Sequence, residues 1–423
     1  MDPIQRRASC ASVLICLSHW SAALLGAEPK VLTLREAIEA AVQHHPSIVA
    51  FAPATEALRQ QSLANGLPPA TTIETQLENF AGTGDASGTK VLEATLQLSH
   101  VIELGGKPDA RRGVGAVELE RLDVSQRAAR ADVAAEVARR FVHVLSDQEQ
   151  LRATTRATEL AERSREAVRQ RITAGATSPI FLSRAEITVT RARIDQEHAE
   201  HELASSRVAL AVLLGEREPS FASVSADLFA LATIEPLDTY LRRLDGNAEL
   251  LMFAADDRVL DAKQRVAQAH RSPNITLNAG VRRLEALDDQ AFVAGFSIPL
   301  GTRKRSAPEF AALRSEREQL ALTAQAKRLE LHATLFALYQ EVIHARTEVN
   351  ALREEVRPEA ERVLRTSDEG YRAGRFSLIE LADAQRQLLE VERDAIRAAA
   401  EFHVHLIEIE RLTGEAVHTL VTR

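Results

Sequence analysis

Cysteine and aromatic residues are scarce in this chain. Its two cysteines, Cys10 and Cys16, both lie near the start, and only 4% of its 423 residues are aromatic. Residues 1–27 have the basic start, the apolar run and the small-residue end of a secretory signal peptide. The mature chain would therefore hold no disulfide, and a core of large aromatic rings is excluded; whether the N-terminus is lipidated stays open.

The chain also lacks an excess of positive charge and a second long apolar run. Its formal net charge is −8 at pH 7, which argues against nucleic acid as a partner. After the signal, no stretch approaches the eighteen apolar residues of a membrane-spanning helix. The alanine, leucine, arginine and glutamate content is typical of long helices with small residues along their seams.

Patterns that would indicate catalysis are absent from the sequence. The histidine pairs His198/His201 and His403/His405 lack an HExxH form or a nearby cysteine set, so we expect no bound metal. His405 falls on an apolar seam, where a packed core histidine is expected. No nucleophile, metal set or cofactor loop is present, so we expect neither an enzyme nor a cofactor.

The most informative feature is a tandem repeat. Gly175-Ala-Thr-Ser-Pro-Ile180 returns 199 residues later as Gly374-Arg-Phe-Ser-Leu-Ile379, and both copies reach Gly-Glu after forty more residues. Between these points, apolar residues recur alternately three and four positions apart, as in a coiled coil. The seam of the second copy is Leu381, Ala384, Leu388, Val391, Ala395, Ala398, Phe402, His405, Ile409 and Leu412.

Each half also contains two stretches in which apolar and polar residues alternate. They predict hairpins with strands at about 71–80 and 90–102, and at about 274–283 and 290–300. Such strands suit a half-buried soluble sheet or an outer membrane equally well. The helical stretches that follow, 107–172 and 304–373, would each extend about 100 Å, which is too long for a compact domain.

Helix-capping residues and prolines divide the chain further. Thr33 and Glu36 form a capping box at the first helix, Pro46 interrupts that helix, and Pro358 is expected to bend a later one. We expect a first repeat at 28–215, a linker at 216–246, a second repeat at 247–415 and a tail at 416–423.

The order of elements in this chain resembles that of the outer-membrane efflux proteins of the TolC family. Each half has a helix, a hairpin, a long helix, a glycine turn and a returning helix. The resemblance covers residues 31–415 and is strongest at Tyr371-Arg-Ala-Gly374 with Leu381–Arg386, and at the repeat near Gly175. The run Ile102–Lys107 is most similar to the heavy-metal, CzcC-like branch. Pro108 departs from that branch, which usually has a basic residue there.

The resemblance implies a mainly α fold with a small β part. Three protomers with four transmembrane strands each would form a twelve-stranded β-barrel in outer-membrane lipid, continued by a periplasmic α-helical barrel. The location would be the outer membrane of a Gram-negative bacterium.

The resemblance also implies roles for particular residues at the inner end of the tube. Glu380 and Asp383 would form a periplasmic gate as two rings of three carboxylates, which attract cations. The helix tips at Arg171, Gly175, Arg372 and Gly374 would dock a periplasmic adaptor, which connects to an inner-membrane pump. Alternatively, Glu380 and Asp383 are ordinary solvated helix residues.

The function so implied is the exit duct of a tripartite efflux system that exports divalent heavy-metal cations. A multidrug or small-molecule duct of the same family is the alternative. A soluble periplasmic coiled-coil scaffold or adaptor is an alternative of another class. The sequence leaves the cargo open, because selectivity in such systems lies largely in the pump.

Overall fold

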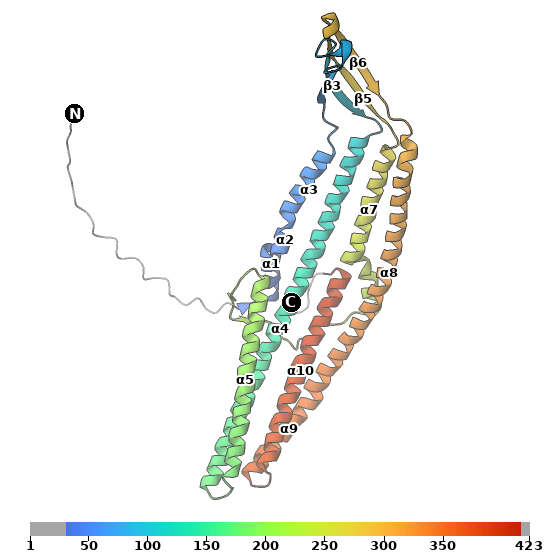
Figure 1. Ribbon diagram of the computed structural model, residues 1–423. Coiled ribbons are helices and arrows are strands. Elements are labelled where there is room, and N and C mark those ends of the chain that lie inside the picture. Colours follow the sequence, from blue (N-terminus) through green and yellow to red (C-terminus); the bar gives the residue numbers. More distant parts are fainter. Residues whose placement is uncertain (1–30, 416–423) are drawn as a thin grey trace, which may run out of the picture.

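The computed structural model describes residues 31–415 and shows an elongated molecule with a small sheet at one end (Figure 1). Two helical hairpins form the opposite end, and long helices connect the ends. The expected signal peptide, with Cys10 and Cys16, and the tail at 416–423 lie outside the described residues. The predicted fold class, mainly helical with a small β part, is confirmed.

The described residues form ten α-helices and six strands, besides three short 3-10 turns and one π-helical segment. The helices are α1 Leu34–His44, α2 Pro46–Val49, α3 Phe51–Asn65, α4 Lys107–Thr173, α5 Ile180–Leu213, α6 Leu237–Arg243, α7 Ala248–Ala269, α8 Thr302–Asn350, α9 Arg357–Arg372 and α10 Leu378–Thr413. The strands are β1 Val31–Leu32, β2 Thr72–Glu78, β3 Glu93–Glu103, β4 Ser223–Val224, β5 Asn274–Leu284 and β6 Asp289–Ser297.

The two predicted hairpins join into one antiparallel sheet of order β2-β3-β5-β6. Because paired residues point to the same side of a sheet, the register places Ile73, Leu98, Ala279 and Ala294 in one row of a single face. That face is apolar and exposed, and Phe292 on it is 93% exposed. On the opposite face, Arg282 forms ion pairs with Glu78 and Glu93.

The shaft has two halves that share α4. Toward the sheet, α4 packs against α3 and α7, and α7 packs against α8; toward the tips, α4 packs against α5 and α10, and α10 packs against α9. The seam of α10 is largely buried, as expected from its spacing. The expectation for His405 is wrong: His403 is the fully buried histidine, while His405 is partly exposed.

His403 is buried because the segment between the repeats crosses α10 at this level. Its Nε2 lies 2.8 Å from the Leu228 carbonyl oxygen, and its Nδ1 has no hydrogen-bond partner among the described residues. Burial lowers the pKa of His403 below its ordinary value. The imidazole is therefore a neutral core group that donates one hydrogen bond.

Local signals at the helix ends behave as the sequence predicts. Thr33 and Glu36 form the capping box of α1, and Pro46 begins α2. Pro358 does not break the helix that contains it. It lies in the first turn of α9, directly after a π-helical segment, Ala351–Val356, whose wider turn accommodates the missing N–H and the proline ring.

Residues 214–247 connect the repeats across the middle of the shaft. Here β4 pairs in parallel with β1, a contact that the sequence did not predict, because both strands have only two residues. Asn247 caps α7 and also donates a hydrogen bond to the Leu412 carbonyl oxygen, 2.9 Å away. These short contacts fix the beginning of the first repeat against the connection, and the beginning of the second repeat against its own end.

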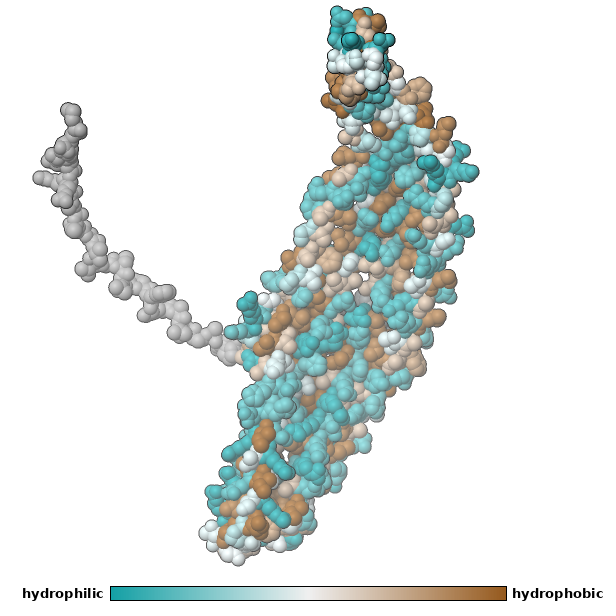
Figure 2. Space-filling view, in the orientation of Figure 1, coloured by the Kyte–Doolittle hydropathy of each residue, from teal (hydrophilic) through white to brown (hydrophobic). Residues whose placement is uncertain are grey.

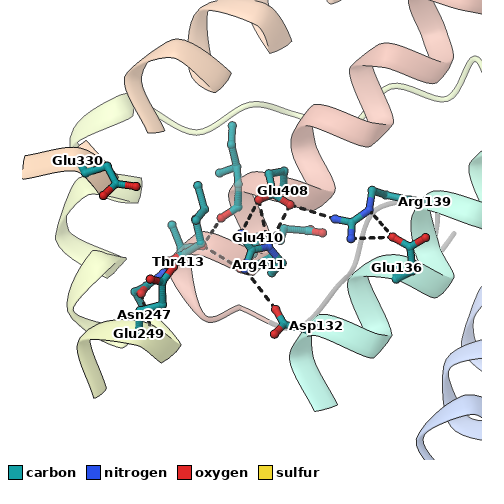
Figure 3. A network of polar contacts seen from close by, with 12 residues as sticks. Asp132, Glu136, Arg139, Asn247, Glu249, Glu330, Glu408, Glu410, Arg411 and Thr413 are labelled. Carbon is teal, nitrogen blue, oxygen red and sulfur yellow. Dashed lines mark hydrogen bonds and ion pairs between the residues drawn. The ribbon is translucent and has the colours of Figure 1, made fainter. Parts of the chain in front are cut away.

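Charged residues join α4 to α10 at the same level (Figure 3). Arg139 lies between Glu136 of its own helix and Glu408 of α10, with its Nη1 3.0 Å from the Glu408 Oε2. Arg411 of α10 binds Glu408 and reaches Asp132 of α4. The network aligns the two helices that form the centre of the bundle.

The face of the molecule in Figure 2 has a mixed surface. Figure 2 shows mostly hydrophilic residues on the shaft, with hydrophobic residues in strips along it and again around the sheet. Within residues 31–415, none of the helices combines the length and the apolar character needed to cross a membrane.

Candidate functional site at the helix tips

The two helix tips are built from the same turn. At the first, the Gly175 N–H donates to the Ile172 carbonyl and the Ala176 N–H to the Arg171 carbonyl; at the second, Gly374 and Arg375 donate to Tyr371 and Gly370. This is the Schellman pattern, which requires a left-handed residue after the helix. Gly175 and Gly374 supply it, with φ of 70° and 74°.

Arg171 connects the two tips. Its Nη1 donates a hydrogen bond to the Tyr371 carbonyl oxygen, and its guanidinium lies 4.8 Å from the centre of the Tyr371 ring. Tyr371 is only 4% exposed and packs in a small core with Val168 and Leu381. Arg171 thus points from one hairpin to the other rather than away from the molecule.

The second tip has no arginine at the equivalent position because Phe376 occupies that space. A Cβ built on Gly370 would lie 2.1 Å from the Phe376 Cδ2. Any side chain at residue 370 would therefore displace the Phe376 ring. Arg372 does not replace the missing arginine, since it is largely exposed and pairs with Asp368 of its own helix at 2.9 Å.

Glu380 lies in the first turn of α10 and helps to cap that helix. Its side chain accepts a hydrogen bond from the Ser377 N–H at 2.6 Å, and its own N–H donates to the Ser377 Oγ at 3.3 Å. This is a capping box, and these hydrogen bonds to Ser377 hold the pKa of Glu380 below its ordinary value. The exposed carboxylate therefore keeps its negative charge at neutral pH.

Asp383 lies one turn farther along α10. It accepts hydrogen bonds from Arg386 at 2.5 Å and from Gln387 at 2.8 Å. Both partners belong to its own helix, so Asp383 is held without contributing to the contact between the hairpins. Because Glu380 and Asp383 are three residues apart, they lie on neighbouring positions of one helix face.

A groove of about 470 Å³ runs between α5 and α10, with α4 as its floor. Asp383 and Arg386 line it from α10, and Arg184 and Arg191 line it from α5. Arg184 is the repeat counterpart of Asp383, so residues at equivalent positions carry opposite charges. Farther along, Arg393 of α10 binds Asp195 of α5 at 2.9 Å and closes the space between these helices.

The sequence did not reveal how these residues meet. The sequence indicates Tyr371 only as part of a motif, while the structure places its ring and carbonyl against Arg171. Gln385, of the same motif, donates to the Ser164 Oγ of α4 at 2.8 Å. Residues 171 and 370 are equivalent positions of the two repeats, but one is arginine and the other is glycine. This difference is the sequence feature that could have indicated a contact between the repeats at Arg171.

The site contains carboxylates but no set of metal ligands. Among residues 31–415, no group of three or more histidine, cysteine, aspartate or glutamate side chains is arranged to hold a metal ion. The tips present the carboxylates of Glu380 and Asp383 together with the guanidinium groups of Arg171 and Arg372. They offer neither a nucleophile nor a general base in a closed pocket.

Comparisons with known proteins agree with this description. The family model described as outer membrane efflux protein matches residues 37–216 and 241–415. The cobalt-zinc-cadmium resistance protein CzcC of Cupriavidus metallidurans is 27% identical over 76% of this chain and 77% of its own length. The nickel-cobalt-cadmium resistance protein NccC of Alcaligenes xylosoxydans xylosoxydans is 25% identical over 62% of this chain and 59% of its own.

A solved structure supports the fold. The crystal structure of CusC superposes with a TM-score of 0.73 at 16% identity and covers 90% of this chain and 92% of the other. The shared elements are therefore the long helices and the small sheet.

Proposed function

We propose a cargo for this chain, which belongs to the outer membrane efflux protein family. As a member of that family, it is a non-enzymatic outer-membrane efflux channel with a periplasmic helical extension. The proposed cargo is a divalent heavy-metal cation. The observation that carries this proposal is the similarity to two proteins named for resistance to cobalt, cadmium, zinc or nickel. The carboxylates Glu380 and Asp383 at the tips are consistent with it, since they favour the passage of cations.

We propose that the working unit is a homotrimer. In Figure 1, α5 and α9 lie on opposite edges of the lower shaft. On α5, the exposed Ile187 and Ile194 stand 12 and 19 residues after Gly175; on the opposite edge, the exposed Val363 and Val356 stand 11 and 18 residues before Gly374. Matching heights of apolar residues favour the packing of α5 against the α9 edge of a neighbouring protomer.

The sheet supports the same assembly. β2 and β6 are its edges, and each has unpaired N–H and C=O groups that would pair with the next protomer. Three sheets joined in this way would place the exposed apolar face, with Phe292 and Phe296, against outer-membrane lipid. In the same proposal, residues 28–215 and 247–415 are the two repeats and residues 216–246 are the linker.

At the other end, the tips would form both the gate and the docking surface. Glu380 and Asp383 of three protomers would make two rings of carboxylates. Gly175, Gly374 and the exposed Arg372 would contact a periplasmic adaptor, which links the duct to an inner-membrane pump. Arg171 would act differently: its bond to Tyr371 holds the two hairpins of one protomer together, and opening would break it.

Metal export is tested in cells that carry the cognate pump and adaptor but lack this chain. Restoring the chain is expected to lower the accumulation of Zn²⁺, Co²⁺ or Cd²⁺ and to raise tolerance to that metal. Tolerance to an apolar organic compound, measured in parallel, tests the small-molecule alternative. Protection against the organic compound alone would refute the proposed cargo while leaving the duct intact.

The carboxylate rings are tested in planar bilayers with the purified channel. Glu380→Gln with Asp383→Asn is expected to reduce the preference for cations over anions. Glu355→Gln with Glu401→Gln removes the same charge from two exposed residues of the shaft and is the matched control. Equal selectivity in the two double variants would move the constriction away from Glu380 and Asp383.

A further inference from the structure

A group of exposed basic side chains lies where the sheet joins the shaft, far from the helix tips. Arg271 follows the end of α7, and Arg303, Lys304 and Arg305 lie in the first turn of α8. Figure 1 shows that α7 ends and α8 begins directly beneath the sheet. The Thr302 hydroxyl donates a hydrogen bond to the Arg271 carbonyl oxygen at 2.7 Å, so the two segments are held side by side. We call the four basic residues the basic belt.

The side chains of the basic belt have no polar partner in the described part of the chain. All four are exposed, and among residues 31–415 none of them forms an ion pair or a side-chain hydrogen bond. The first carboxylate of α8, Glu309, is held by the His270 Nδ1 at 3.4 Å. The basic residues of the first repeat at this level are each engaged: Lys107 with Asn274, Arg111 with Glu103, and Arg112 with Asp109.

The join between sheet and shaft is therefore positive in a protein with a formal charge of −8. Residues 103–112, 270–273 and 301–309 contain seven lysines and arginines but three aspartates and glutamates. The unbalanced cations are those of the basic belt, since the other three have partners.

Helix stability does not explain three cations in the first turn of α8. The N-terminal end of a helix carries a partial positive charge, which favours aspartate and glutamate there and disfavours lysine and arginine. The first turn of α8 has no acidic residue, and Gly301 provides no side-chain cap. By contrast, α1 and α10 each begin with a capping box that includes a glutamate. An anion beside the basic belt would offset this unfavourable arrangement.

A neighbouring protomer cannot cover the whole basic belt. Arg271 directly follows α7, which packs between α4 and α8 and therefore does not form an edge of the protomer. Successive residues of a helix point about 100° apart, so the side chains from Arg303 to Arg305 extend over more than half of the circumference of α8. The buried Ser306 marks the packed side of the helix, and the three exposed cations lie outside it. A single helix–helix contact would leave part of the belt open.

The basic belt begins where the apolar face of the sheet ends. Phe296, Ile298 and Leu300 continue the alternation of β6 toward α8 and are 74%, 41% and 89% exposed. Arg303 to Arg305 follow Leu300 by three to five residues, a rise of about 5–8 Å along a helix. The headgroup layer of a bilayer adds about 5–8 Å to each side of the hydrocarbon core. When the apolar face lies in hydrocarbon, the backbone of the belt therefore lies at the depth of the headgroups, which long basic side chains can reach.

We propose that the basic belt binds the phosphate headgroups of anionic phospholipids in the periplasmic leaflet of the outer membrane. Charge complementarity and continuity with the apolar face both favour this occupant. Arginine can hold two phosphate oxygens at once, and basic residues beside a membrane-embedded segment attract anionic lipids. The belt would fix the depth of the channel in the membrane. The inference rests on the proposed placement of the sheet in lipid, but it concerns an anion rather than the transported cation.

The test uses the full-length channel in mixed micelles that contain equal amounts of phosphatidylglycerol and phosphatidylcholine with the same acyl chains. Mass spectrometry quantifies each lipid that stays bound after affinity purification. Wild type is expected to enrich phosphatidylglycerol about tenfold or more, and salt is expected to reduce the enrichment. Arg303→Gln with Lys304→Gln and Arg305→Gln is expected to retain the two lipids about equally. The matched control, Arg130→Gln with Arg163→Gln and Arg217→Gln, removes three exposed arginines elsewhere and is expected to enrich like wild type.

Two further measurements separate lipid binding from folding. Because the three glutamines remove cations from a helix N-terminus, the variant is expected to unfold in lipid-free detergent at or above the wild-type temperature. Arg303→Lys with Arg305→Lys keeps the charge and is expected to keep the enrichment.

Equal enrichment in wild type and the glutamine variant would overturn the proposal. So would release of the bound lipid by an equal concentration of inorganic phosphate, or enrichment only by dissociated protomers, which would assign the cations to a neighbouring copy of the chain. Retention of neither lipid by a protein that stays in solution without detergent would instead refute the placement of the sheet in lipid.

Discussion

Replacing Arg171 by glutamine is expected to favour the open state of the channel. Arg171 is the side chain that bridges the tips of the two hairpins, through the Tyr371 carbonyl and the Tyr371 ring. A hydrogen bond from a charged donor contributes about 1.5–3 kcal/mol. A partly exposed cation–π contact adds about 0.5–1 kcal/mol.

Since solvent screens the exposed side of Arg171, we take about 2 kcal/mol for each protomer. This free energy corresponds to a shift of roughly 30-fold in the equilibrium between joined and separated hairpins. The effect would act at each of three tips in a trimer. Single-channel recording in a planar bilayer measures it as a higher open probability or a larger conductance.

Two variants make the experiment specific. Tyr371→Phe keeps both the ring and the carbonyl, and its lost hydroxyl has no hydrogen-bond partner among the described residues, so its conductance is expected to match wild type. Arg372→Gln removes an exposed arginine that is bound only to Asp368 of its own helix, and is also expected to match. If Arg171→Gln conducts like these two variants, the bridge does not hold the hairpins closed.

Two further predictions concern stability. Gly370→Ala is expected to lower the free energy of unfolding by about 1–3 kcal/mol, because the added methyl group displaces Phe376. Gly113→Ala, in an open part of α4, is expected to raise it by about 0.5–1 kcal/mol. Thermal unfolding of the two variants and the wild type measures both changes. For His403, burial lowers the pKa, so below the ordinary value near 6.5 the unfolded chain binds a proton that the folded chain does not. Stability is therefore complete above about pH 6.5 and falls as the pH drops toward the lowered pKa. His403→Gln is expected to flatten the unfolding temperature between pH 7.5 and 5.5, and an unchanged slope would assign the pH effect to other groups.

The sequence predicted the parts of the fold that depend on local pattern. The alternation around Ile73 and Leu277 identified the strands, the three-four spacing identified the seams, and Gly175 and Gly374 identified the turns. Each of these signals is contained within a few neighbouring residues, and the duplication displayed each of them twice. The family resemblance rests on these patterns because each of them occurs in both repeats.

Contacts between distant segments could not be predicted in this way. The pairing of β1 with β4 involves two residues on each side, too few for a periodic signal. His403 and His405 lie two residues apart, and the seam spacing favoured His405, because the segment at Leu228 that buries His403 belongs to the connection between the repeats. At Pro358 the sequence predicts a bend, and the π-helical segment before it has no marker in the sequence that would distinguish it from a kink.

The differences between the repeats point to where the function lies. Where the repeats agree, as in the Schellman turns at Gly175 and Gly374, they build two equivalent hairpins. Where they disagree, the change fits a particular contact: Arg171 of the first copy reaches Tyr371 of the second, while Gly370 makes room for Phe376 of its own copy. Likewise Asp383 lies across a groove from Arg184, its own counterpart. The divergence at residues 171 and 370 therefore leaves one arginine, Arg171, by which the first hairpin holds the second.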